Sequence, residues 1–147
     1  MSPGRADDVV IGRHLAALDS ALTRLQRYST LTREALGADL DLQWLVEHGL
    51  RLCCQNVLDI ATHLTASAGA VAPDYRGAID GLAHLGVLPA DFATGLRGLA
   101  GFRNVLVHGY LEVDLDIVHD VLSRQLPDFA RFAQLVRAWL AARQPHD

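Results

Sequence analysis

Apolar residues recur at helical spacing near the start of the chain, and this periodicity limits the possible folds more than any other feature. Between residues 11 and 25 they are separated by intervals of four, three, four and three, in the set Ile11, Leu15, Leu18, Leu22 and Leu25. Residues at these spacings lie along one face of an α-helix, whereas a half-buried strand needs an apolar residue at every second position. The segment from about residue 7 or 8 to Tyr28 is therefore predicted to be an amphipathic helix.

Composition extends the helical prediction to the whole chain. Its 147 residues include 25 Leu and 21 Ala but only nine aromatic residues, and half of all residues are hydrophobic. Leu and Ala favour helices, whereas strands favour β-branched and aromatic residues, and this apolar content excludes a disordered chain. We expect one all-α domain over residues 1–147, with a folded core from about residue 8 to residue 142.

Caps and helix breakers divide the rest of the chain. We expect a connector with one short helical turn over 29–40, and then helices over about 41–67, 74–85, 88–107 and from 114 onward, the last kinked or split by Pro127. Together these form an antiparallel, up-and-down bundle of about five helices. Gly95, Gly98 and Gly101 fall inside the expected fourth helix, where each costs about 1 kcal/mol relative to Ala. Either a neighbouring backbone packs unusually close there, or the glycines are neutral.

Charge and cysteine usage exclude several classes of protein. All 13 basic residues are Arg, and the net charge is −4, so a broad basic face that coats nucleic acid is not expected, although a phosphate site of one or two arginines is. The two cysteines, Cys53 and Cys54, are adjacent, which suits neither a disulfide nor a metal site, and we interpret them as buried thiols. The N-terminus has no secretory signal pattern, and no apolar run is long enough to cross a membrane. We expect a cytoplasmic protein without metal, cofactor or membrane partner.

The stretch 102–110 concentrates polar side chains among apolar ones and is the candidate site. Within it lie Arg103, Asn104, His108 and Tyr110. Asn104 and His108 share a helix face, but Arg103 and His108 are five residues apart, which separates them by about 140° around a helix. Either the helix unwinds near His108, or Arg103 and His108 meet across a twofold dimer. On spacing alone, a salt-linked surface and a helix cap explain the same residues.

A second polar row lies on the expected helix 41–67. Asp59 and His63 are four residues apart, and Gln55 and Arg51 extend the same face. This row is either a helical ion pair on a solvated face or the lining of a cleft. The spacing alone leaves both interpretations open.

Several motifs together resemble those of HepT-type toxins, which belong to the HEPN superfamily of helical ribonucleases. Residues 103–110 read R-N-V-L-V-H-G-Y and match the family's R-x4-H-x-Y signature. The stretches D-I-A-T-H-L at 59–64 and L-A-H-L-G-V-L at 82–88 resemble two further family segments, and Asp128, Phe129 and Phe132 match its last helix. The likeness covers residues 8 to 142. One departure is Gln55, where relatives often carry an acid.

The resemblance implies a function as well as a HEPN-like fold. It implies the toxin of a type VII-like toxin–antitoxin pair: a homodimeric, metal-independent endoribonuclease in which Arg103 and His108 cleave RNA. Asn104, Asp59 and His63 would support them. The implied antitoxin is an MntA-type nucleotidyltransferase that transfers AMP to Tyr110. The alternative is a non-catalytic HEPN module that docks a nucleotidyltransferase or binds a nucleotide phosphate; a purely structural dimer is the third possibility.

Overall fold

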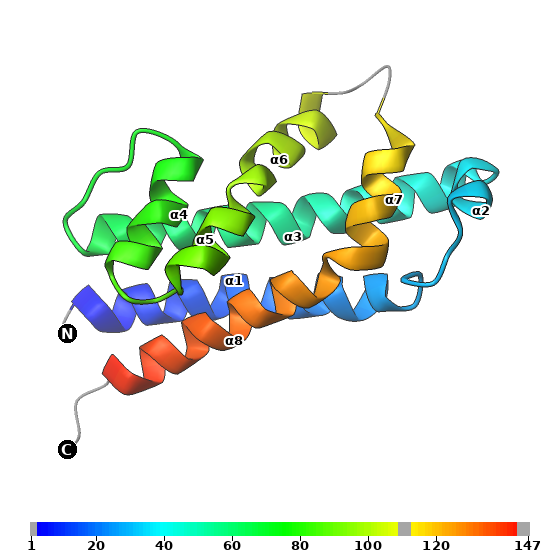
Figure 1. Cartoon of the computed structure of the whole chain (residues 1–147). Coiled ribbons are helices and arrows are strands. Elements are labelled where there is room, and N and C mark those ends of the chain that lie inside the picture. Colours follow the sequence, from blue (N-terminus) through cyan, green and yellow to red (C-terminus); the bar gives the residue numbers. More distant parts are fainter. Residues whose placement is uncertain (1–2, 109–112, 144–147) are drawn as a thin grey trace.

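The computed structural model describes residues 3–108 and 113–143, and this part of the chain forms eight helices and no strand (Figure 1). In chain order the helices are α1 (Pro3–Gln26), α2 (Arg33–Gly37), α3 (Leu40–Ser67), α4 (Tyr75–His84), α5 (Ala90–Leu96), α6 (Gly98–His108), α7 (Leu115–Arg124) and α8 (Leu126–Arg143). The prediction of an all-α bundle is confirmed. None of the described helices is long and apolar enough to cross a membrane.

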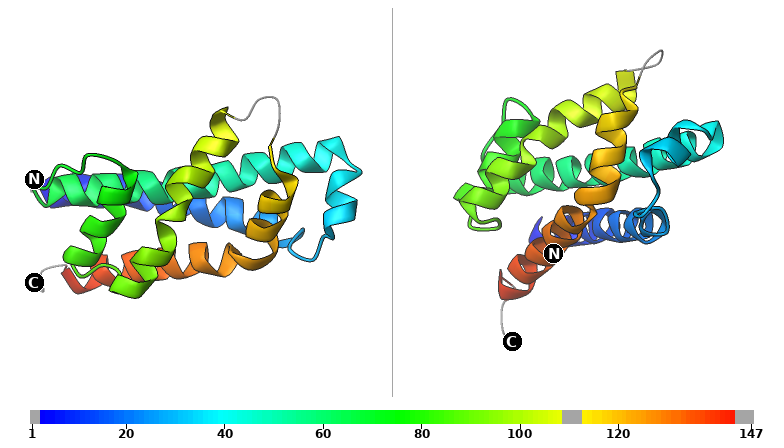
Figure 2. Two further views of the ribbon diagram at one scale, coloured as in Figure 1. Left: turned by 45° about the horizontal axis from the view of Figure 1, so that its top comes forward. Right: turned by 45° about the vertical axis from the view of Figure 1, so that its right-hand side comes forward.

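The long helix α3 forms the centre of the bundle. It runs antiparallel to α1, and α8 returns along α1, so that the start of α1 and the end of α8 lie at the same end of the molecule (Figures 1 and 2). Helices α2, α4, α6, α7 and α8 also contact α3. Because α6 crosses α3 and then rises away from the bundle, its last turns stand at the edge of the molecule (Figure 1).

The predicted apolar face of the first helix is confirmed as part of the core. Ile11, Leu15, Leu18, Leu22 and Leu25 are all buried. Across the bundle they meet apolar residues of α3 and of α8, where Phe129 and Phe132 are the largest fully buried side chains. Cys53 and Cys54 are buried as predicted, and burial raises the pKa of the Cys53 thiol to about 12, so this thiol stays protonated at neutral pH.

The prediction of one continuous helix over 88–107 is wrong, because the structure divides this segment into α5 and α6 at Arg97. Gly95 and Gly98 flank the break and weaken helix propensity on both sides of it. The Arg97 side chain donates two hydrogen bonds to the Asp80 carboxylate of α4, at 2.8 and 2.9 Å, and this contact ties the break to a neighbouring helix. The last predicted helix is likewise split, into α7 and α8 at Gln125, as the position of Pro127 allowed.

The glycines of this segment have open space around them. A Cβ atom built on Gly95, Gly98 or Gly101 meets no heavy atom within 4 Å outside its own helix turn. The expectation of a closely packed backbone is therefore wrong within the described protomer. Gly86 has the predicted role, because it ends α4 with a φ of 81°, a left-handed conformation that side chains disfavour.

Close packing instead occurs at Gly49, where α3 crosses α1. A Cβ on Gly49 would lie 2.7 Å from Cδ2 and 2.9 Å from Cγ of Leu25, which is fully buried. We expect Gly49→Ala to lower the free energy of unfolding, because overpacking costs about 1–3 kcal/mol and exceeds the roughly 1 kcal/mol of helix propensity gained. Urea unfolding followed by circular dichroism measures the change.

Gly12 of α1 provides the matched control for this substitution. A Cβ there meets nothing within 4 Å, so Gly12→Ala should raise the free energy of unfolding by up to about 1 kcal/mol. A Gly49→Ala protein as stable as Gly12→Ala would show that Leu25 adapts and that the α1–α3 contact is loosely packed.

Candidate functional site

A chain of three hydrogen-bonded side chains joins α6 to α3. Arg103 Nε donates a 2.8 Å hydrogen bond to Gln55 Oε1, and Gln55 Nε2 donates a 2.8 Å hydrogen bond to Asp59 Oδ1. All three side chains are half-buried. Because Gln55 and Asp59 are four residues apart, they occupy one face of α3, and Gln55 presents its amide oxygen to the arginine above it. The arrangement holds the Arg103 guanidinium in one orientation.

The other contacts of Arg103 leave its positive charge available to a ligand. Its Nη1 donates to Asn104 Oδ1 at 3.2 Å, and its Cζ lies 5.8 Å from the ring centre of Tyr75. Among the described residues these partners are amides and an aromatic ring, whereas Arg97 is paired directly with Asp80. An arginine whose donors are not all directed at a carboxylate can bind a phosphate oxygen.

The predicted residues Asp59, Asn104 and Arg103 are brought together. Gln55 and Asp59 of the α3 row connect to Arg103 through hydrogen bonds, while both interpretations of the row stay open. His63 is half-buried one turn beyond Asp59 on α3. His108 is the last residue of α6, but its side chain, like the whole of Tyr110, lies outside the described residues.

Helix α6 runs without a break from Gly98 through Arg103 to His108. Of the two alternatives for pairing Arg103 with His108, unwinding of the helix before His108 is therefore not observed. In one regular helix the two positions are about 140° apart. Because the His108 side chain and residues 109–112 lie outside the described part of the chain, the pairing of Arg103 with His108 across a dimer stays a prediction.

Gln55 and Tyr75 are the two site residues whose roles the sequence did not indicate. Gln55 was noted as an extension of the α3 row and as a departure from an expected acid, and it is the direct partner of Arg103. The spacing of Gln55 four residues before Asp59 was the available signal. Tyr75 opens α4 directly after its cap, Asp74, and lines a surface hollow of about 360 Å³ together with Thr62 and Ala72.

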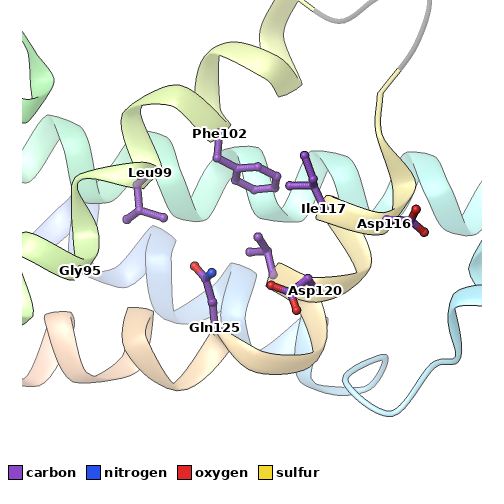
Figure 3. Close-up of a pocket in the computed structure, with 9 residues that line it drawn as sticks. Gly95, Leu99, Phe102, Asp116, Ile117, Asp120 and Gln125 are labelled. Atoms are coloured by element: carbon purple, nitrogen blue, oxygen red, sulfur yellow. The ribbon is translucent and has the colours of Figure 1, made fainter.

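The other side of α6 has a different character. A hollow of about 410 Å³ lies between α5, α6 and α7. Leu99 and Phe102 lie on one wall and Ile117 on the other (Figure 3). Its carboxylates are already engaged, because Asp116 pairs with Arg33 at 2.6 Å and Asp120 pairs with Arg124 at 3.2 Å. This apolar and acidic surface does not suit a phosphate, which leaves the Arg103 side as the candidate anion site.

The described part of the chain contains no cluster of side chains suited to binding a metal ion. Over residues 3–108 and 113–143, no three His, Cys, Asp or Glu side chains lie close enough together to hold a metal ion. The remaining described histidines include two with structural contacts: His14 Nδ1 is 2.8 Å from Asn56 Oδ1, and His119 Nε2 is 2.8 Å from the carbonyl oxygen of Leu31. These contacts join α1 to α3, and α7 to the loop before α2.

Comparison with known proteins identifies the family. The family described as "Ribonuclease HepT-like" matches residues 18–136, a range that contains every candidate site residue from Gln55 to Tyr110. The chain belongs to the HepT-like ribonuclease family. Its resemblance to HepT-type toxins, first based on short motifs, is thereby confirmed over most of its length.

Individual relatives agree with this assignment. The chain is 29% identical over 134 residues to the mRNA nuclease HepT of Shewanella oneidensis, covering 90% of this chain and 98% of that protein. It is 22% identical over 136 residues to the tRNA nuclease HepT of Aphanizomenon flos-aquae, with 91% and 92% coverage. The solved structure of a tri-AMPylated HEPN toxin from Shewanella oneidensis in complex with its MNT antitoxin superposes with a TM-score of 0.77 at 27% identity, covering 94% of this chain and 99% of that one.

Proposed function

We propose that this HepT-like protein is the toxin of a type VII-like toxin–antitoxin pair and cleaves RNA as a metal-independent endoribonuclease. The observation that carries the proposal is the oriented guanidinium of Arg103, which Gln55 holds at 2.8 Å at the edge of the bundle. The names of its relatives, an mRNA nuclease and a tRNA nuclease, support RNA as the substrate class.

The reaction needs no nucleophile from the protein, because RNA carries its own. The ribose 2′-oxygen forms a bond to the adjacent phosphorus, the bond from phosphorus to the 5′-oxygen breaks, and the products are a 2′,3′-cyclic phosphate and a 5′-hydroxyl. One proton leaves the 2′-hydroxyl and one is delivered to the departing 5′-oxygen. His108 is proposed to move these protons, since imidazole titrates near neutral pH.

Arg103 is proposed to bind the phosphate and stabilise the charge that develops on its oxygens. Donors already held in place are worth most for this purpose, because they need no reorganisation in the transition state. Asp59 acts through Gln55, as it accepts the amide hydrogen bond that fixes the oxygen facing Arg103. Asn104, which accepts a hydrogen bond from Arg103, and His63 are proposed as supporting residues.

A homodimer is proposed to complete the site. Arg103 and His108 lie on an uninterrupted α6 and are about 140° apart, so one helix does not direct both at the same phosphate. A twofold axis near the end of α6 brings His108 of one protomer toward Arg103 of the other. It also supplies two histidines, one for each proton transfer.

The antitoxin is proposed to be an MntA-type nucleotidyltransferase, in keeping with the complex formed by the relative from Shewanella oneidensis. The phenolic oxygen of Tyr110 attacks the α-phosphorus of ATP, the bond to the pyrophosphate leaving group breaks, and the phenolic proton passes to a base. The added AMP carries a phosphodiester charge that Arg103 attracts. The modified toxin then blocks its own RNA phosphate site.

Removal of metal ions provides the direct test of the proposed reaction. The purified protein should cleave RNA at an undiminished rate in excess EDTA, and the 3′ ends should carry a 2′,3′-cyclic phosphate or the monoester formed by its opening. Both outcomes follow from a mechanism in which Arg103 and His108 supply all the charge and proton transfer. Loss of cleavage in EDTA that added Mg²⁺ restores would refute metal independence.

A further inference from the structure

A row of side chains leads along α3 from the outer end of the helix to Arg103. Trp44, His48, Arg51 and Gln55 follow one another at intervals of four, three and four, and therefore share one face of α3. We call these four residues the α3 stripe. At 1.5 Å per residue the stripe is about 16 Å long. Its inner end is Gln55, which binds Arg103, and its outer end is Trp44.

Trp44 presents an unusually large aromatic surface to solvent. Its side chain is 81% exposed, although tryptophan is normally among the most extensively buried residues. It lies beside Leu45 on the same helix, which is 41% exposed. A flat ring left in water at the end of a polar row is a surface on which a planar ligand group can stack.

The middle of the stripe is basic. Arg51 Nη2 lies 3.2 Å from His48 Nδ1, and both side chains are exposed. His48 also lines a groove of about 610 Å³ between α1 and α3, to which α1 contributes Arg24 and Arg27. Among the described residues that line this groove, none is acidic. Three arginines and a histidine thus gather here in a chain whose net charge is −4.

Carboxylates limit the basic surface at its margins. Asp41 lies one helical turn beyond Trp44 and marks the outer end of the stripe. Glu47 lies to one side of the stripe on α3, and partial burial raises the pKa of its carboxyl group. An anionic chain is therefore attracted to the section between Trp44 and Arg103 and repelled beyond it.

The combination of an aromatic face with arginines is typical of single-stranded nucleic acid binding. Successive bases stack on aromatic rings and on guanidinium planes, and basic side chains follow the backbone phosphates. A second copy of this chain fits the stripe less well. A twofold contact centred on the stripe would bring Arg51 and His48 toward their own copies and remove water from these basic groups.

We propose that the α3 stripe binds the single-stranded RNA that flanks the cleaved bond, with a base stacked on Trp44 and phosphates bound by Arg51 and His48. This inference rests on the proposed function, because it takes Arg103 as the site of the reacting phosphate. The stripe makes cleavage of a longer strand more efficient than cleavage of the bare dinucleotide. It selects unpaired RNA, since a paired base does not offer its face to the indole.

The test compares two substrates, a dinucleotide that reaches only the reacting phosphate and a single-stranded decanucleotide. In Trp44→Ala the ratio of kcat/KM for the decanucleotide to that for the dinucleotide should fall about 5- to 150-fold, because stacking contributes about 1–3 kcal/mol per base. Trp44→Phe should recover most of the ratio. Arg51→Ala should lower decanucleotide affinity and reduce the slope of log Kd against log salt by about one.

Arg124→Ala serves as the matched control, because it removes an exposed arginine from α7, away from the stripe. Its ratio should equal that of the parent. An unchanged ratio in Trp44→Ala would overturn the proposal. A shift of Trp44→Ala to a smaller species in sedimentation velocity would also overturn it, by showing that the stripe is a contact between copies.

A binding measurement separates this proposal from the proposed function. The chain has two tryptophans, so Trp139→Phe leaves Trp44 as the single indole fluorophore. Quenching of this fluorescence by the decanucleotide reports stacking whether or not the RNA is cut. Quenching without cleavage would refute the proposed nuclease activity and support RNA binding by the α3 stripe. Cleavage without quenching would support the nuclease activity and refute RNA binding by the stripe.

Discussion

Arg103→Ala and His108→Ala are each expected to reduce the rate of RNA cleavage by about 10²- to 10⁴-fold. Removal of a preorganised donor to a developing oxyanion costs about 10²- to 10³-fold, and loss of a general acid–base about 10²- to 10⁴-fold. The fold should persist, because Arg103 is half-buried at the edge of α6 while Leu99 and Phe102 make the helix's core contacts. Initial rates on a fluorogenic RNA, with circular dichroism as the folding measurement, provide the check.

Arg97→Ala is the matched control for this experiment. Arg97 lies directly before α6 and binds Asp80 rather than Gln55, so its loss should leave cleavage near the parental rate. Mixing Arg103→Ala and His108→Ala protomers should restore part of the activity if the two residues act across a dimer. If the variant that carries both Arg103→Ala and His108→Ala cleaved RNA at the parental rate, the catalytic proposal would be refuted. A module that binds nucleotide phosphate without cleaving RNA would then be favoured.

Tyr110→Phe is expected to abolish control by the antitoxin while retaining the activity of the toxin. The substitution keeps the ring but removes the hydroxyl oxygen to which AMP is proposed to be attached. Cells expressing this variant with its nucleotidyltransferase should therefore stop growing, whereas cells with the parental pair should grow. The intact mass of the parent, after incubation with ATP and the nucleotidyltransferase, should rise by one or more AMP units.

Tyr75→Phe is the control for this second experiment. Tyr75 is another tyrosine near Arg103, with its ring centre 5.8 Å from the Arg103 Cζ, and its hydroxyl is an alternative acceptor on the same side of α6. We expect Tyr75→Phe to acquire AMP as the parent does. If the mass increase persisted in Tyr110→Phe and disappeared in Tyr75→Phe, the modified residue would be Tyr75 of α4.

Local sequence patterns predicted most of the helices and the core of α1. Helical periodicity places residues such as Leu18 and Leu25 on one face of the helix, independently of the other helices. Both residues are fully buried. Caps were equally readable, since the Asp114 carboxylate accepts a hydrogen bond from the Asp116 amide at the start of α7. The same motif-level reasoning singled out Arg103, Asn104 and Asp59, which the structure brings together.

The break at Arg97 was not readable from local patterns. Helix propensity at Gly95 and Gly98 weakens the segment without specifying where it bends. The bend is tied to α4 through Asp80, which is 17 residues away in the chain. Likewise, Gly95 and Gly98 suggested a close backbone contact, but close contacts lie at Gly49, against Leu25 of α1, and at Gly81, against Thr65 of α3.

By itself the sequence determined an all-α bundle, its main apolar faces and the residue types that carry the chemistry, because these depend on spacing within a few helical turns. Only the tertiary structure decided that Gln55 orients Arg103, since this hydrogen bond joins residues 48 positions apart. It also decided that α6 continues unbroken to His108 and that Gln55, the inner end of the α3 stripe, contacts Arg103. These features depend on where α6 crosses α3, which the packing of side chains from several helices sets together.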